Sequence, residues 1–189
     1  MPKLAVLVSG VGSVLEAILS YPLQVDLVVA DRPCRALQVA KDAEVASVLV
    51  RREDFSPAFS VEARRRLTSS VYEALTEHGI DIVAMAGFMT VLDASLFRDF
   101  HGPILNTHPS LLPAFKGANA VREALEYGVQ WTGCTVHVAT AALDEGPIIV
   151  QCPVEIFKDD TVATLHERIK EAERRVYPEA IGQVLARCG

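Results

Sequence analysis

The stretch that decides the fold class is LAVLVSGVGS, residues 4–13. Its first half, residues 4–8, is a short uncharged run of apolar residues, which is typical of a strand buried on both faces of a sheet. Its second half is a glycine-rich turn, and a segment with helical spacing of apolar residues follows. A buried strand that turns through glycines into a helix predicts the first unit of an α/β sheet.

The same alternation continues through the first two thirds of the chain. Short apolar runs rich in Val and Ile predict strands at 4–8, 25–29, 45–50, 80–85 and 103–106. Between and after them, helical spacing predicts helices at 13–20, 35–43, 60–78, 93–99 and 117–128. This order predicts a doubly wound, mostly parallel, Rossmann-like α/β sheet.

The pattern changes after Gly128. Residues 134–138 and 148–154 are two strand-like runs joined by a turn-rich stretch, which predicts an antiparallel hairpin at the sheet edge. A long final helix is expected from about Thr161, and Pro178 is expected to kink or interrupt it. No internal repeat or linker is visible, so residues 1–189 are expected to form a single domain.

Composition excludes several classes of protein. A formal net charge of −6 and a pI near 5.4 disfavour a broad nucleic-acid-binding face. No apolar run reaches membrane-spanning length, so neither nucleic acid nor membrane is expected as a partner, and the expected location is the cytoplasm. No metal is expected either, because the four cysteines lie far apart, at Cys34, Cys134, Cys152 and Cys188.

The glycine-rich turn has two interpretations of equal weight. In one, backbone N–H groups of residues 10–13 face an anion such as a phosphate at the start of a helix. In the other, the turn is merely tight and Ser13 caps the helix. The turn matches neither a full dinucleotide fingerprint nor a P-loop, so the residues alone leave the choice open.

A second candidate site follows the strand at 103–106. Asn106 and His108 would lie at the carboxyl edge of the sheet, where ligands of open α/β folds bind, and stiffening prolines follow them. These features favour a functional over a purely structural role. His137, within a strand, is expected to be a core or supporting histidine. By spacing alone, Asp144 is an ordinary turn residue before Gly146.

Several motifs recur here in a fixed order, namely Ser9-Gly10-x-Gly12-Ser13, Ala86-Gly87-Phe88-Met89, Leu105-Asn106-x-His108-Pro109-Ser110-Leu111-Leu112-Pro113, Phe115-Lys116-Gly117 and Gly133-Cys134-Thr135-Val136-His137. With Asp144 at the expected distance, the chain resembles the phosphoribosylglycinamide formyltransferases, folate-dependent enzymes of purine synthesis, over essentially its whole length. Several ordered motifs at matching spacings are far more specific than any one of them.

The resemblance implies a function and its residues. The activity would be transfer of the formyl group of 10-formyltetrahydrofolate to the amine of glycinamide ribonucleotide, by a monomer or homodimer acting on small molecules. The implied catalytic residues are Asn106, His108 and Asp144. The implied contacts of the ribonucleotide are Gly12, Ser13, Val14 and Glu173. The implied contacts of the folate are Arg64, Met89, Thr90, Val91, Leu92 and Asn106.

Four positions depart from the usual pattern of the family. Val14 stands where Asn is usual, Val11 where Asn or Thr is frequent, Thr90 where Arg is common, and Glu145 where a small residue is common. Without a side-chain donor at position 14, phosphate would be held mainly by backbone N–H groups. Asn at this position is therefore expected to tighten binding of the ribonucleotide.

The implied mechanism is direct attack through a tetrahedral intermediate, without metal, ATP or a covalent enzyme intermediate. Asn106 and a protonated His108 would stabilise the developing oxyanion, and Asp144 would relay a proton through water. Two alternatives remain. One is another enzyme of 10-formyltetrahydrofolate, a deformylase or a methionyl-tRNA formyltransferase, although both have an additional domain. The other is a non-catalytic folate- or nucleotide-binding module, which the altered phosphate loop suggests.

Overall fold

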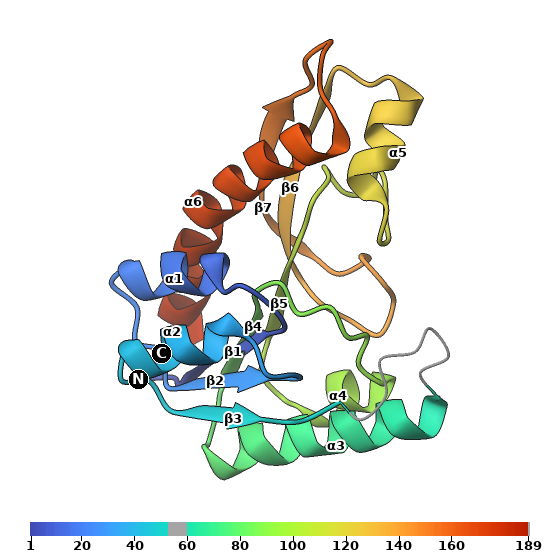
Figure 1. The fold of residues 1–189 in the computed structure, drawn as a ribbon. Coiled ribbons are helices and arrows are strands. Elements are labelled where there is room, and N and C mark those ends of the chain that lie inside the picture. Colours follow the sequence, from blue (N-terminus) through green and yellow to red (C-terminus); the bar gives the residue numbers. More distant parts are fainter. Residues whose placement is uncertain (53–59, 189) are drawn as a thin grey trace.

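One seven-stranded sheet organises the part of the chain that the computed structural model describes, residues 1–52 and 60–188 (Figure 1). The strand order is β3-β2-β1-β4-β5-β6-β7, with β1 to β5 parallel and the last two strands antiparallel. The strands are β1 (Leu4–Val8), β2 (Leu27–Ala30), β3 (Ser47–Leu49), β4 (Ile82–Met85), β5 (Ile104–His108), β6 (Trp131–Val138) and β7 (Ile148–Glu155). All the predicted strands are present.

Helices cover both faces of this sheet. They are α1 (Ser13–Ser20), α2 (Arg35–Asp42), α3 (Val61–Glu77), α4 (Ala94–Asp99), α5 (Ala120–Tyr127) and α6 (Val162–Cys188). Helices α1 and α6 lie on one side of the parallel strands, and α3 and α4 lie on the other (Figure 1). The predicted doubly wound sheet with a late hairpin and a long final helix is thereby confirmed.

Burial on both faces explains why residues 4–8 are uniformly apolar. Leu4, Val6 and Val8 pack in the cluster that includes α1 and α6 residues, whereas Ala5 and Leu7 pack in the cluster with α3 and α4. All five side chains have no exposed surface. Full burial of a Leu or Val contributes about 1.5–3 kcal/mol each, so this strand anchors both layers.

The hairpin of β6 and β7 is longer than the sequence predicts. Gly133 lies opposite Pro153 in the register, and a Cβ atom at position 133 would come within 2.1 Å of the Cys152 carbonyl oxygen. Glycine therefore permits this close pairing. The connection between the two strands, residues 139–147, carries Asp144 back toward the end of β5.

Helix α6 runs without a break from Val162 to Cys188, so Pro178 does not interrupt it, and the expected kink stays a prediction. Packing on both sides of the proline outweighs the lost backbone hydrogen bond. Tyr177 and Ile181 are fully buried, and the Tyr177 hydroxyl lies 3.1 and 2.9 Å from the carbonyl oxygens of Met85 and Leu105.

Among the residues described, no helix combines the length and apolar character needed to cross a bilayer.

Candidate active site

The end of β5 presents neighbouring side chains to opposite faces of the sheet. The strand extends to His108, two residues beyond the prediction, so Asn106 and His108 share one face and Thr107 faces the other. Asn106 lies opposite His137 in the antiparallel register with β6. The structure therefore brings the amide and the two histidines to one edge of the sheet.

His108 is held between two oxygen acceptors. Its Nε2 lies 2.8 Å from the Phe115 carbonyl oxygen, and its Nδ1 lies 3.4 Å from Oδ2 of Asp144. The carbonyl can only accept, so Nε2 carries a hydrogen, and a hydrogen on Nδ1 as well would suit the carboxylate. The ring is 5% exposed. Each ring nitrogen therefore faces an oxygen atom that can accept a hydrogen bond.

Asp144 is buried beside both histidines, although its spacing in the sequence suggests a plain turn. Its Oδ2 accepts a hydrogen bond from the Gly117 backbone at 2.9 Å, and its Oδ1 lies 3.8 Å from Nε2 of His137. The backbone φ of 55° is in the left-handed region, which Asp tolerates better than most residues. The hydrogen bond from Gly117 thus holds the carboxylate against His108.

The neighbouring Glu145 contacts the same opposing loop. Its carboxylate forms an exposed ion pair with Lys116, with a distance of 2.8 Å between Nζ and Oε1. The hydrogen bond from Lys116 lowers the pKa of Glu145. This departure from the family pattern therefore adds a second contact between the 139–147 connection and residues 109–119.

His137 orients the Asn106 amide. Its Nδ1 lies 3.2 Å from the Val138 carbonyl oxygen, which places a hydrogen on Nδ1 and leaves Nε2 as an acceptor, 3.3 Å from Nδ2 of Asn106. Burial lowers the pKa of His137, only partly opposed by the Val138 carbonyl and Asp144, so the ring stays neutral. One Nδ2 hydrogen of Asn106 therefore remains for a ligand. The predicted supporting role fits this position.

The glycine-rich loop turns its carbonyl groups toward α2. The Gly10 carbonyl accepts from the Ala36 backbone at 3.2 Å, and the Val11 carbonyl accepts from Arg35 at 2.9 Å. Gly12 has a φ of 86° and is itself the N-cap of α1, so Ser13 does not cap the helix. Within the described residues, the N–H groups of residues 11–13 contact no acceptor. Free N–H groups at the start of a helix suit an anion such as phosphate.

Val14 offers a ligand only its backbone. Its side chain is 9% exposed and packs in the cluster with α1 and α6 residues. An Asn side chain there would lie in the core rather than beside an anion. This packing argues against the expectation that Asn at position 14 tightens binding, and that expectation stays a prediction.

Glu173 reaches the same strand from the opposite face. Its Oε1 accepts a hydrogen bond of 3.0 Å from the Thr107 hydroxyl, and the residue is 8% exposed on α6. Burial raises the pKa of the Glu173 carboxyl, although the Thr107 hydrogen bond opposes this shift. The glycine-rich loop and Glu173 thus both lie on the side of the sheet that carries α1 and α6.

Residues 89–92, expected to line the folate site, divide into exposed and buried side chains. Met89 and Val91 are 75% and 56% exposed, whereas Thr90 and Leu92 are 5% and 7% exposed. The backbone N–H of Met89 donates to the Ser9 hydroxyl at 3.0 Å. Only Met89 and Val91 can therefore offer their side chains to a ligand in this conformation.

A buried carboxylate, Asp31, connects this segment to the glycine-rich loop, and sequence reasoning missed it. It has no exposed surface, forms a two-pronged ion pair with Arg32, and accepts from the Thr90 hydroxyl at 2.5 Å. Burial raises the pKa of Asp31, but hydrogen bonds from Arg32, Thr90 and Ser9 outweigh it and hold the pKa below its usual value. An acidic residue directly after the second strand was the available signal.

Two further features lie on the α3 and α4 side of the sheet, namely Arg64 on α3 and a cavity beside α4. The Arg64 Nε is buried and has no hydrogen-bond partner among the described residues. A cavity of about 460 Å³, also missed from the sequence, extends along α4 and the start of the 139–147 connection. Its lining includes Phe97, Phe100, Ile104 and residues 138–141.

Comparison with known proteins gives consistent matches over the whole length. The formyl transferase family profile matches residues 2–181. A phosphoribosylglycinamide formyltransferase from Mycobacterium tuberculosis is 42% identical over 184 residues, which cover 95% of this chain and 83% of the relative. The enzyme of that name from Bacillus subtilis is 36% identical over 192 residues, covering 98% and 95%. The crystal structure of a Bacillus halodurans phosphoribosylglycinamide formyltransferase superposes with a TM-score of 0.86 at 34% identity, covering 99% of this chain and 97% of that one.

Proposed function

This chain belongs to the formyl transferase family, and we propose that it is a phosphoribosylglycinamide formyltransferase of purine synthesis. The substrates are 10-formyltetrahydrofolate, as the formyl donor, and glycinamide ribonucleotide, as the acceptor. The observation that carries the proposal is the convergence of Asn106, His108 and Asp144 at the carboxyl edge of a sheet that matches solved enzymes of this name.

The two substrates would approach the end of β5 from opposite sides. On the side of α1 and α6, the glycine-rich loop supplies N–H groups for the phosphate, and the Glu173 carboxylate accepts hydrogen bonds from ribose hydroxyls. On the other side, Met89, Val91 and the unpaired donor of Arg64 are available to the folate. The substrate amine and the formyl carbon would meet between these two sides.

The chemistry follows from the groups at this edge. The amine nitrogen forms a bond to the formyl carbon, and the carbonyl oxygen becomes negative in the tetrahedral intermediate. The free Nδ2 hydrogen of Asn106 and the positive charge of His108 stabilise that oxygen. The bond from carbon to N10 of the folate then breaks. Asp144, acting through water, accepts the amine proton and returns one to N10.

Further properties belong to the same proposal. The chain acts as a single domain over residues 1–189, as a monomer or homodimer in the cytoplasm. Its ligands are small molecules, with no part for metal, nucleic acid or membrane. The rival deformylase activity would use the same donor but transfer its formyl group to water. A non-catalytic binding module would bind one or both ligands without turnover.

A steady-state assay tests the proposal. Purified protein is mixed with 10-formyltetrahydrofolate, and release of tetrahydrofolate is followed by absorbance with and without glycinamide ribonucleotide. The proposal predicts release that depends on the ribonucleotide and saturates with it. Equal release without the ribonucleotide would identify a deformylase, and binding without release would identify a non-catalytic module.

A further inference from the structure

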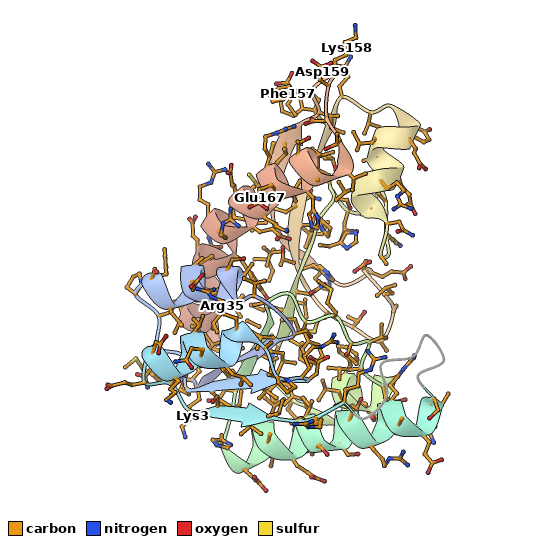
Figure 2. All side chains as sticks on the ribbon, in the orientation of Figure 1. Lys3, Arg35, Phe157, Lys158, Asp159 and Glu167 are labelled. Atoms are coloured by element: carbon orange, nitrogen blue, oxygen red, sulfur yellow. The ribbon has the colours of Figure 1, made fainter. Side chains whose placement is uncertain are left out.

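Arg35, the first residue of α2, lies between α1 and α2 beside the glycine-rich loop (Figure 2). Its Nη1 donates to the Val11 carbonyl oxygen at 2.9 Å, and its Nη2 lies 2.6 Å from Oε1 of Glu16. The proposed chemistry assigns no role to this side chain. Its two contacts nevertheless join α2 to the loop proposed to hold phosphate and to the helix that follows it.

The contact with Val11 determines where one N–H group points. The carbonyl and N–H of a trans peptide group point in opposite directions. Because Arg35 holds the Val11 carbonyl toward α2, the N–H of Gly12 in the same peptide group points away from α2. The Ala36 backbone holds the Gly10 carbonyl in the same way and so directs the N–H of Val11. Two successive N–H groups are thereby available to one anion.

The second contact neutralises a charge that would oppose phosphate. Glu16 lies in the first turn of α1, which begins directly after Gly12. An isolated carboxylate there would repel a phosphate dianion bound at the same helix end. Arg35 pairs with it, and their hydrogen bond lowers the pKa of Glu16.

We propose that Arg35 is a positioning residue for the substrate phosphate, acting by holding the Val11 carbonyl so that the Gly12 N–H faces the anion. This inference rests on the proposed function, because it assumes that the loop binds the phosphate of glycinamide ribonucleotide. It also explains how phosphate is held in a chain whose Val14 side chain is buried in the core.

The test compares Arg35→Met with Lys3→Met. Lys3 is a matched control, because its exposed ammonium also donates to a backbone carbonyl, that of His78 at 3.0 Å, near the amino ends of the strands (Figure 2). Arg35→Met should raise the KM for glycinamide ribonucleotide about tenfold, the effect of one charge-assisted hydrogen bond. The kcat and the folate KM should stay within about twofold of wild type, and Lys3→Met should change none of the three.

A substrate without phosphate tests whether the effect of Arg35→Met depends on the phosphate group or comes from a general loosening of the site. For glycinamide riboside, which lacks the 5′-phosphate, kcat/KM should be the same for Arg35→Met and wild type. Equal loss with both substrates would overturn the proposal, because the loss would then not depend on phosphate.

The double variant Arg35→Met/Glu16→Gln separates the two contacts. If orientation of the Val11 peptide matters, the KM for the ribonucleotide stays raised after the carboxylate is removed. Full recovery of the wild-type KM would show that Arg35 only neutralises Glu16, and the proposal would be overturned. If the wild-type protein does not formylate the ribonucleotide, the proposed function fails. If the wild-type protein formylates the ribonucleotide but Arg35→Met has a normal KM for it, the proposed function stands and only the role of Arg35 fails.

Discussion

The Asp144 carboxylate and the His108 imidazole are both nearly buried, with 3.4 Å between Oδ2 and Nδ1. His108 is the last residue of β5, whereas Asp144 lies in the 139–147 connection, where the Gly117 backbone holds its carboxylate in place. Because the other nitrogen of His108 faces the Phe115 carbonyl, the ring has an acceptor on each side. The pair therefore places an imidazole and a carboxylate in contact at one point of the sheet edge.

Asp144→Asn tests whether the Asp144 carboxylate relays a proton. Asn keeps the size and the hydrogen bond from Gly117 but loses the charge, so kcat should fall by at least about tenfold with little change in the folate KM. Steady-state kinetics with both substrates measure the effect. An unchanged kcat with only a raised folate KM would place Asp144 in binding rather than chemistry.

His108→Ala and Asn106→Ala test whether these two side chains stabilise the oxyanion of the tetrahedral intermediate. Each should lower kcat by about 10²–10³, the loss expected for removal of one oxyanion donor. His166→Ala, on α6 and outside the described site, serves as the control and should keep wild-type turnover. Near-normal kcat in either of the first two variants would remove that residue from the mechanism.

The sequence predicted the parallel sheet and the place of Asn106 and His108 because both depend on local patterns. Buried strands read as apolar runs, and a residue after a parallel strand lies at the carboxyl edge. Asp144 could not be joined to His108 in this way, since their contact depends on how the hairpin connection folds back. The contacts of Asp31 with Thr90 and of Arg35 with Val11 and Glu16 were missed for the same reason, because these partners lie far along the sequence. Pro178 does not interrupt α6, because packing of the helix outweighs the local helix-breaking tendency of proline.

Glu173→Gln tests the buried carboxyl on α6 through the pH dependence of stability. Burial raises the folded-state pKa of Glu173, so its contribution to stability is fully present below the unfolded-state pKa and is lost as pH rises through the folded-state value. Gln does not ionise and can still accept from Thr107. The free energy of unfolding of the variant, relative to wild type, should therefore increase between about pH 4 and pH 7. A constant difference over this range, by urea titration, would contradict the raised pKa.

Val14→Asn tests whether a side chain at position 14 of the glycine-rich loop can reach a bound phosphate. Because the Val14 side chain packs in the core, a buried amide without a partner should lower the free energy of unfolding by about 1–3 kcal/mol and should not tighten ribonucleotide binding. Val11→Asn is the matched control, since Val11 is 66% exposed. Tighter binding by Val14→Asn at unchanged stability would restore the original expectation from the sequence.

The most direct measurement follows the fate of the formyl carbon. Donor labelled with ¹³C in its formyl group is incubated with the wild-type protein and glycinamide ribonucleotide, and the products are observed by ¹³C NMR. The account predicts that the label appears in the formamide group of the formylated ribonucleotide, in equal amount to the tetrahydrofolate released. Label that appears in free formate instead would show transfer to water and would contradict formyl transfer to the substrate amine.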